Sequence, residues 1–165
     1  PVDIAAVIDQ AVSEMSPRLA DKHINVHVDM VEDLPRMRSN RESLLQILLH
    51  LLKNASSVTP SEGTVYLHAR QEKDDENHPY LLIQVGDSGE GISLEDLPNV
   101  FSSEYRNEHP DIRGVGDNGV GLTLAKSLTT AQGGRIWVDS QNDRTTYSVL
   151  IPVQPVEVTP GESPP

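Results

Sequence analysis

Residues that could hold a charged ligand fall in three short segments of this chain, 50–55, 87–92 and 118–122. In the first segment, His50 and Asn54 stand four residues apart, so a helix would carry both side chains on one face. The neutral amide oxygen of Asn54 suits a magnesium ion that takes its other ligands from phosphates and water. A lone Asn near the end of a helix more often bonds to its own backbone, so this residue alone identifies no site.

The second segment begins where an apolar run ends. Asp87 follows the run 82–85, and glycines occupy positions 89 and 91. A carboxylate at the exit of a buried strand can accept a hydrogen bond from the amino group of adenine, while Gly89 and Gly91 let the backbone pass close to a flat ring. A turn in which the Asp bonds its own backbone explains the pattern equally well. An EF-hand calcium loop is excluded because its third position would be Gly89, which offers no side-chain oxygen.

The third segment opens a helix with two glycines, Gly119 and Gly121. Glycines leave the first backbone N–H groups of a helix uncovered, and these groups form a phosphate-binding site at the positive end of the helix dipole. A pair of glycines that lets two helices pack closely is the alternative. The chain contains no Gly-Lys-Ser or Gly-Lys-Thr, so this is no Walker loop. No predicted strand comes directly before it, as a Rossmann dinucleotide site would require.

The elements that must position these segments alternate between helical and strand periods. Apolar spacings of three and four predict long helices over 2–19 and 40–57, with Asn40 as the N-cap of the second. The remaining predicted elements are strands over 24–30, 64–71 and 80–85, a short helix over 94–100, a helix over 119–131, and strands over 135–140 and 145–153. This order predicts an α/β fold in which helices cover one face of a single mixed sheet.

Two segments show no period. Residues 101–118 are polar, and we expect them to form a mobile loop whose length is typical of a lid over a site. Residues 154–165 contain four prolines and one glycine, which predicts a disordered Pro-rich tail. We therefore expect one domain over 1–153 followed by this tail.

Composition narrows the classes of ligand and location. Lys and Arg number 13 against 25 Asp and Glu, and the formal net charge of -12 argues against a nucleic-acid partner. Magnesium and a few local donors can still hold one nucleotide on an acidic protein. The chain has no cysteine, so disulfides and thiolate chemistry are excluded. No apolar run reaches the roughly 20 residues that span a bilayer. We expect no membrane contact and a cytoplasmic location, whether the whole protein is soluble or a membrane-bound sensor.

Together, the three segments resemble the Asn box and the two glycine boxes of the histidine-kinase branch of the family that includes gyrase, Hsp90 and MutL. Further segments that look like family segments lie at 45–48, 96–101, 132–138 and 145–149, so the resemblance covers roughly residues 1–153. It implies a two-layer α/β sandwich, the Bergerat-type ATP-binding fold, with a mixed and mostly antiparallel sheet. ATP would lie between the long helix and the lid, with Mg²⁺ as its metal.

The resemblance also implies the reaction and its residues. The γ-phosphoryl group of Mg-ATP would pass to a histidine on a dimerisation hairpin outside this fragment, and a response regulator would act downstream. His50 and Asn54 would be catalytic, Asn54 would bind the metal, and Asp87 would recognise adenine. The nucleotide would be held by Asn54, Asp87, Gly89, Gly91, Ile92, Arg106, Arg113, Gly119, Val120, Gly121, Leu122 and Thr146. None of the 6 histidines lies in a phosphoacceptor pattern, so the fragment is not expected to autophosphorylate alone.

Three positions depart from the family pattern. His50 stands where many kinases have an Asn, Ser57 replaces a common basic residue, and Asp117 replaces a common glycine. Arg106 and Arg113 in the lid could supply the charge that Ser57 lacks. These departures keep open a second hypothesis, a degenerate nucleotide-binding regulator or pseudokinase. An anti-sigma-type serine kinase, which has a related fold, is a third, whereas a gyrase- or MutL-like ATPase would need a Glu at position 50.

Overall fold

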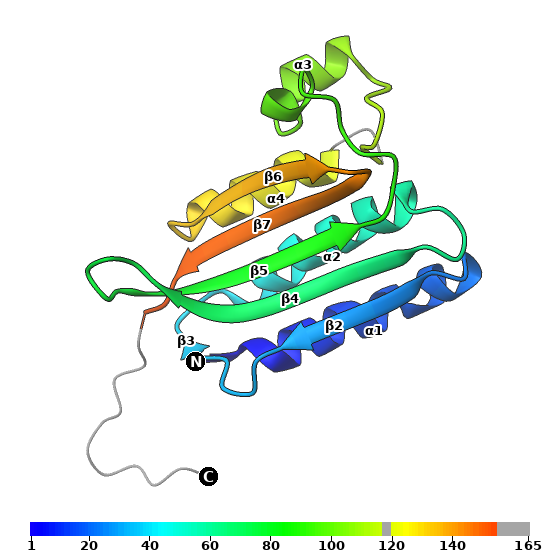
Figure 1. Ribbon diagram of the computed structural model, residues 1–165. Helices are drawn as coiled ribbons and strands as arrows, with labels where there is room; N and C mark the ends of the chain where they lie inside the picture. The colour runs from blue at the N-terminus through cyan, green and yellow to red at the C-terminus, as the bar shows by residue number, and fades with distance from the viewer. Residues whose placement is uncertain (117–119, 155–165) are drawn as a thin grey trace, which may run out of the picture.

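The structure is a computed structural model that describes residues 1–116 and 120–154 (Figure 1). Within these ranges the helices are α1 Ile4–Asp21, α2 Arg41–Val58, α3 Ser103–Glu108 and α4 Val120–Ala131, with a short 3₁₀ helix, η1, at Leu97–Asn99. The strands are β1 Val2–Asp3, β2 Asn25–Met30, β3 Arg36–Met37, β4 Thr64–Lys73, β5 Pro79–Asp87, β6 Arg135–Gln141 and β7 Arg144–Pro152.

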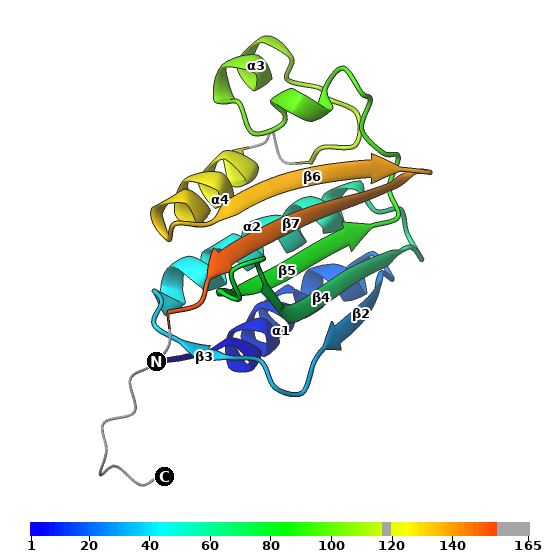
Figure 2. The same cartoon turned by 60° about the vertical axis from the view of Figure 1, so that its left-hand side comes forward.

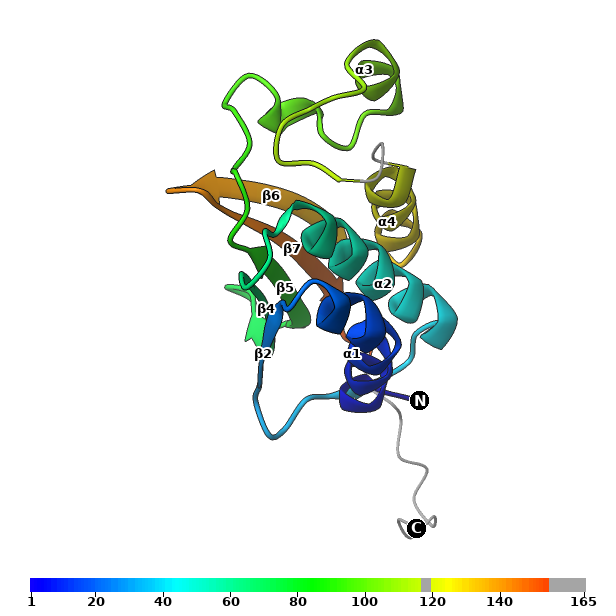
Figure 3. The same cartoon turned by 90° about the vertical axis from the view of Figure 1, so that its right-hand side faces the viewer.

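A five-stranded sheet in the order β2-β4-β5-β7-β6 forms one layer of the molecule. β2 runs parallel to β4, and the other neighbours are antiparallel. Figure 3 shows α1, α2 and α4 together on one side of this sheet, and none of the described helices covers the opposite face. The predicted two-layer sandwich with a mixed, mostly antiparallel sheet is confirmed.

The core lies between the two layers, because the helix and strand periods both direct apolar side chains there. On β4, Val65, Leu67 and Ala69 alternate toward the helices and are at most 2% exposed. On α2, Leu51 and Leu52 are 0% exposed. Burial of each large apolar side chain stabilises the folded state by about 1.5–3 kcal/mol. The position of α2 is therefore determined by its leucine-rich face.

α2 is also fixed at both ends. At its start, the Asn40 side chain accepts a hydrogen bond from the Ser43 N–H at 2.9 Å, as expected of an N-cap. At its end, the Lys22 ammonium donates to the carbonyl oxygens of Ser56 at 2.7 Å and of Thr59 at 2.8 Å. A cation suits the unpaired carbonyls and the negative dipole at a helix C-terminus. The C-terminal end of α2 is thus tied to the turn that follows α1.

The open face of the sheet carries the only tryptophan of the chain. Trp137 on β6 pairs with Ser148 on β7 and is partly buried. The Arg135 guanidinium lies over its ring, 5.5 Å from the ring centre. On the same face, the Arg144 guanidinium lies 4.3 Å from the ring centre of Tyr66 on β4. Both cation–π pairs stand on the side of the sheet away from α2.

The structure differs from the prediction at its short elements. Residues 103–108 of the expected loop form α3, which begins where the Ser102 Oγ accepts from the Tyr105 N–H at 3.3 Å. The Tyr105 hydroxyl donates to Asp96 at 2.6 Å and fastens α3 to the segment before it. The helix predicted over 94–100 is reduced to the 3₁₀ turn of η1. The paired strands β1 and β3 are two residues each, too short to show a period in the sequence.

Asp117, Gly119 and residues 155–165 of the predicted tail lie outside the described residues. No helix in the described ranges is both long and apolar enough to cross a membrane. α3 stands beyond one end of the sandwich, and the N-terminus lies at the other end (Figure 1; Figure 2). The C-terminal ends of α2 and β5 and the start of α4 lie at the α3 end, so the fold brings the three predicted segments together there.

Candidate functional site

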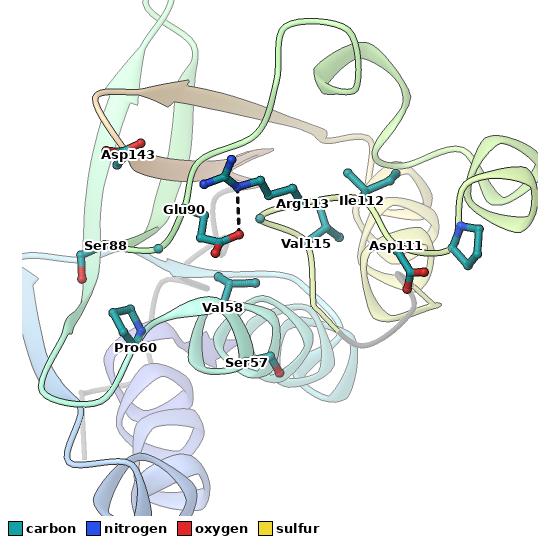
Figure 4. A pocket seen from close by; sticks show the side chains of 13 residues that line it. Ser57, Val58, Pro60, Ser88, Glu90, Asp111, Ile112, Arg113, Val115 and Asp143 are labelled. Carbon is teal, nitrogen blue, oxygen red and sulfur yellow. Dashed lines mark hydrogen bonds and ion pairs between the residues drawn. The ribbon is translucent and has the colours of Figure 1, made fainter.

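A cavity of about 810 Å³ lies at this end of the molecule (Figure 4). Its walls are Ser57 and Val58 at the end of α2, the loop residues 88–90 after β5, and residues 110–115 after α3. A cavity of this volume is typical of sites that take a ligand the size of a nucleotide. We refer to residues 101–116 as the lid.

Asp87 ends β5 beside this cavity and is 1% exposed. Its Oδ1 accepts a hydrogen bond from the Gly89 N–H at 2.9 Å, whereas its Oδ2 is buried without a hydrogen-bond partner among the described residues. Burial raises the pKa of this carboxyl to about 6, although the Gly89 N–H lowers it. Asp87 therefore bonds its own backbone and also keeps an acceptor atom for a ligand.

Asn54 lies on α2 and is 3% exposed. Its Oδ1 accepts a hydrogen bond from the Gly116 N–H at 3.0 Å, and its Nδ2 has no partner within the described ranges. Asn54 also lines a second cavity, of about 150 Å³, together with His50, Lys53 and Gly121. In this conformation the oxygen that a metal would use already accepts one hydrogen bond from the backbone of the lid.

His50 faces the first turn of α4. A Cβ added at Gly121 would lie 3.2 Å from the His50 Nδ1, so the missing side chain lets α4 approach α2 closely. Burial lowers the pKa of His50, and the charge of Lys53 lowers it further. The imidazole is therefore neutral at pH 7 and has one donor and one acceptor nitrogen.

The lid backbone lies directly on both walls of the site. Gly91 has a φ of 78°, a conformation that favours glycine. A Cβ added at Gly114 would lie 2.0 Å from the Gly91 carbonyl oxygen, and one added at Gly116 would lie 2.6 Å from the Ser57 Cβ. Gly114 consequently packs on residues 88–92, which we call the first glycine loop, and Gly116 packs on α2, and a side chain at either position would not fit.

Three arginines of the described chain border the site in different ways. Arg113 pairs with Glu90, Nε to Oε2, at 3.1 Å, and both residues line the larger cavity (Figure 4). Arg106 of α3 is 4% exposed, and its Nε and Nη1 have no partner among the described residues. Arg18 of α1 donates from Nη2 to the Ser57 Oγ at 3.3 Å. No sequence pattern indicates this last contact, because it joins residues 39 positions apart.

The structure brings most of the other predicted contacts to the same end. Gly89 lines the larger cavity, and Val120 and Leu122 line the smaller one. The N–H of Ile92 donates to the Ser140 Oγ at 2.9 Å, which holds the first glycine loop against β6.

Among the described residues, no group of three or more His, Asp or Glu side chains could bind a metal. The Asn54 amide oxygen together with a ligand's own oxygens is a donor set that suits Mg²⁺.

Thr146 is the predicted contact that the structure places away from the site. Side chains alternate along β7, and Thr145, opposite Asp87, is the residue that faces the helices. Thr146 pairs with Gly86 and lies on the open face. A change of one residue reverses the face of a strand, and no pattern in the sequence resolves it here. Tyr147, the next residue facing inward, is fully buried, and in the sequence it looks like an ordinary core aromatic.

Comparison with known proteins gives a family match over most of the chain. The family model described as histidine kinase-, DNA gyrase B-, and HSP90-like ATPase matches residues 39–155. The adaptive-response sensory kinase SasA of Synechococcus sp. (strain CC9311) is 27% identical over 153 residues, which are 92% of this chain and 39% of that protein. SasA of Trichormus variabilis (strain ATCC 29413 / PCC 7937) is 29% identical over 157 residues, 93% of this chain and 37% of that protein. The chain thus spans less than half the length of these curated relatives.

Solved structures agree on the fold. The mycobacterial sensor histidine kinase MprB has a TM-score of 0.74 at 24% identity, over 94% of this chain and 97% of that chain. Full-length ShkA in complex with AMPPNP has a TM-score of 0.78 at 25% identity, over 94% of this chain and 31% of that chain. These similarities favour neither a serine kinase nor a degenerate regulator. The chain therefore belongs to the histidine kinase-, DNA gyrase B- and HSP90-like ATPase family, as an ATP-binding catalytic domain of the histidine-kinase type.

Proposed function

We propose that this domain binds Mg-ATP and transfers the γ-phosphoryl group to a histidine on a dimerisation hairpin of the same protein. The observation that carries the proposal is a pair of buried polar side chains, Asn54 on α2 and Asp87 on β5, each with one polar atom unpartnered among the described residues. Such atoms are uncommon in folded proteins, and a ligand that supplies the missing bonds accounts for them. The similarity to SasA and to the AMPPNP complex of ShkA supports the same ligand class.

Each group then has a distinct part in the site. The Asp87 Oδ2 accepts a hydrogen bond from the adenine amino group. The Asn54 Oδ1 serves as one oxygen ligand of Mg²⁺, which when bound neutralises charge on the transferred phosphoryl group. The neutral imidazole of His50 donates to a phosphate oxygen from the preceding turn of α2. Phosphoryl transfer needs positioning and charge neutralisation, so a protein nucleophile is not required.

The lid and the start of α4 complete the phosphate end of this site. The first backbone N–H groups of α4, around Val120 and Gly121, bind phosphate oxygens through the helix dipole. Arg106 and Arg113 contribute charge once the lid rearranges around the nucleotide, because loops of this kind close over their substrates. Metal binding would compete with the hydrogen bond between Gly116 and Asn54, since both use the same Asn54 oxygen.

The partners of the domain are proposed from its relatives. ThkA, whose fold this chain shares, was crystallised in complex with the response regulator TrrA. We infer that a response regulator also receives the phosphoryl group downstream of this domain. The reaction would take place in the cytoplasm, where ATP is available.

Calorimetric titration with an unhydrolysable ATP analogue tests nucleotide binding. We expect the wild-type domain to bind the analogue more tightly with Mg²⁺ than without it. The substitution N54A should abolish this gain and leave binding of adenosine unchanged, because only the metal ligand is removed. N25A, at an exposed position on β2, is the matched control and should behave as the wild type. A folded wild-type domain that gives no heat at millimolar analogue would contradict the proposal.

A further inference from the structure

A group of buried polar atoms without hydrogen-bond partners lies around the proposed base-binding part of the site. Among the described residues it consists of the Asp87 Oδ2, the Asn54 Nδ2, the Arg106 Nε and Nη1, and the Tyr147 hydroxyl. All four residues are at most 4% exposed, and they come from β5, α2, α3 and β7. Leaving several polar atoms unpaired in one region is costly, and a polar ligand at their centre would remove that cost. Nothing in the proposed function uses Tyr147.

The register of the sheet places Tyr147 next to Asp87. Tyr147 stands opposite Val85, and Asp87 stands opposite Thr145, so Tyr147 and Asp87 are diagonal neighbours on the inward face. Diagonal neighbours are about 7–8 Å apart at the backbone, within reach of a long aromatic side chain. The Tyr147 ring is held edge-on against Phe101, with the ring centres 6.1 Å apart. These contacts fix the direction of the side chain.

The hydroxyl of Tyr147 is a hydrogen-bond donor at any physiological pH. Burial raises its pKa, and the negative charge of Asp87 raises it further, while the side-chain amide of Asn54 and the charge of Arg106 lower it. The hydroxyl therefore lies near the side chains of Asp87, Asn54 and Arg106. α3, which carries Arg106, belongs to the lid, so movement of the lid would change the surroundings of the hydroxyl.

A carboxylate acceptor beside a hydroxyl donor matches the hydrogen-bonding groups of adenine better than those of guanine. Adenine presents an amino donor flanked by ring nitrogens that accept, whereas guanine presents an oxygen acceptor at the same position. We propose that the Tyr147 hydroxyl donates to a ring nitrogen of the bound base while Asp87 accepts from the adjacent amino group, so that the two residues together select adenine over guanine. This inference rests on the proposed nucleotide binding and adds Tyr147 as a specificity-determining residue.

The substitution Y147F tests the inference, because it removes the hydroxyl and keeps the ring against Phe101. We expect Y147F to weaken binding of an unhydrolysable ATP analogue about tenfold. Binding of the corresponding GTP analogue should change little, so the ratio of the two affinities falls by the same factor. The melting temperature of the ligand-free domain should stay the same or rise, since an unpaired buried hydroxyl is removed. Y66F, on the open face of the same sheet, is the matched control and should change neither ratio nor melting temperature.

The outcomes separate this inference from the function on which it rests. If wild-type domain binds neither analogue, the proposed function fails first. If the wild type binds the ATP analogue and Y147F keeps the wild-type ATP-to-GTP ratio, the inference alone is overturned, and the hydroxyl is only a hydrated core group. Equal weakening for both analogues, with a lower melting temperature, also overturns it, because that pattern reports a structural role.

Discussion

At the scale of single residues, Asp87, which we propose to recognise adenine, also affects the stability of the domain. Its pKa of about 6 in the folded state lies above the ordinary 3.8, so the folded state holds this proton more tightly than the unfolded state. The stability that it contributes is fully present below pH 3.8 and is lost as the pH rises through about 6, by about 3 kcal/mol. D87N keeps an Oδ1 that can accept from Gly89 and removes the charge.

We therefore expect D87N to be more stable than the wild type at pH 8, by up to about 3 kcal/mol, and to lack the loss of stability between about pH 4 and 6. Urea unfolding across this pH range measures both effects. The same variant should bind the ATP analogue about tenfold more weakly, since an amide donor would face the adenine amino group. D139N, at an exposed position on β6, is the control. A D87N domain with the pH dependence of the wild type would show that Asp87 is not a buried charge.

Arg18 offers a second prediction at this scale. Ser57 carries no charge, but the Arg18 guanidinium donates to its hydroxyl at the wall of the larger cavity. R18A should weaken binding of the ATP analogue about threefold, a modest effect because the arginine is exposed, and leave adenosine binding unchanged. The double variant R18A/S57K should recover the loss by restoring a cation beside the phosphates. R41A, at the opposite end of α2, is the control, and an equal loss for adenosine would rule out a phosphate contact.

Single residues could be predicted from the sequence where a short motif contains them. Asn54 and Asp87 are of this kind, since each is recognisable beside its own neighbours. The contacts of Arg18 and Tyr147 join residues that are far apart in the chain, and local spacing contains no information about them. The choice between Thr145 and Thr146 depends on which face of β7 is buried, and the alternation within that strand fixes the answer only once the sheet is known.

At the scale of elements, the lid occupies the site that it is expected to cover. Gly116 donates to Asn54 and packs on Ser57 so closely that an added Cβ would lie 2.6 Å from the Ser57 Cβ. G116A should therefore push this part of the lid away from α2. The amides of residues 112–116 should exchange with deuterium faster in the ligand-free variant, as measured by mass spectrometry. Because the Asn54 oxygen becomes available to the metal, Mg-dependent affinity for the ATP analogue should rise about two- to tenfold.

G86A provides the control for this prediction. A Cβ at Gly86 would meet its nearest atom at 3.5 Å, an ordinary contact, and the residue lies on the face of the sheet away from the lid. Lid exchange and nucleotide affinity should stay unchanged in G86A. Unaltered exchange in G116A would mean that the contact with α2 does not hold the lid.

Long elements were predictable because they repeat their period several times. α2 shows its apolar face over 18 residues, and β4 alternates between buried and less buried residues from Thr64 to Ala69. α3 has 6 residues, fewer than two turns, so its sequence shows no helical period and looks like a loop. α3 is stabilised instead by the N-cap at Ser102 and by the hydrogen bond from Tyr105 to Asp96, which joins α3 to a separate segment of the chain.

At the scale of the whole molecule, both layers contribute to one candidate site, and we propose that its phosphoacceptor lies on a separate hairpin. His50 is the only histidine of the described chain that lines either of the two cavities of the site, and it is part of the proposed phosphate contacts. We expect the isolated domain, incubated with ATP labelled in its γ-phosphate, to acquire no acid-labile label. A matched helical hairpin supplied in trans should become labelled, and N54A should prevent this. A stable label on the domain alone would contradict the assignment of the acceptor to a separate hairpin.

The open face of the sheet also determines what the tryptophan fluorescence of this molecule can report. Trp137 is the only tryptophan, and it stacks under Arg135 on the side of the sheet away from Asn54 and the lid. We therefore expect its fluorescence to follow global unfolding and any contact made by the open face, and to stay unchanged when nucleotide binds. In a nucleotide titration, the tryptophan emission should then stay constant up to saturation. A change in emission would instead indicate a contact or a rearrangement on the open face of the sheet.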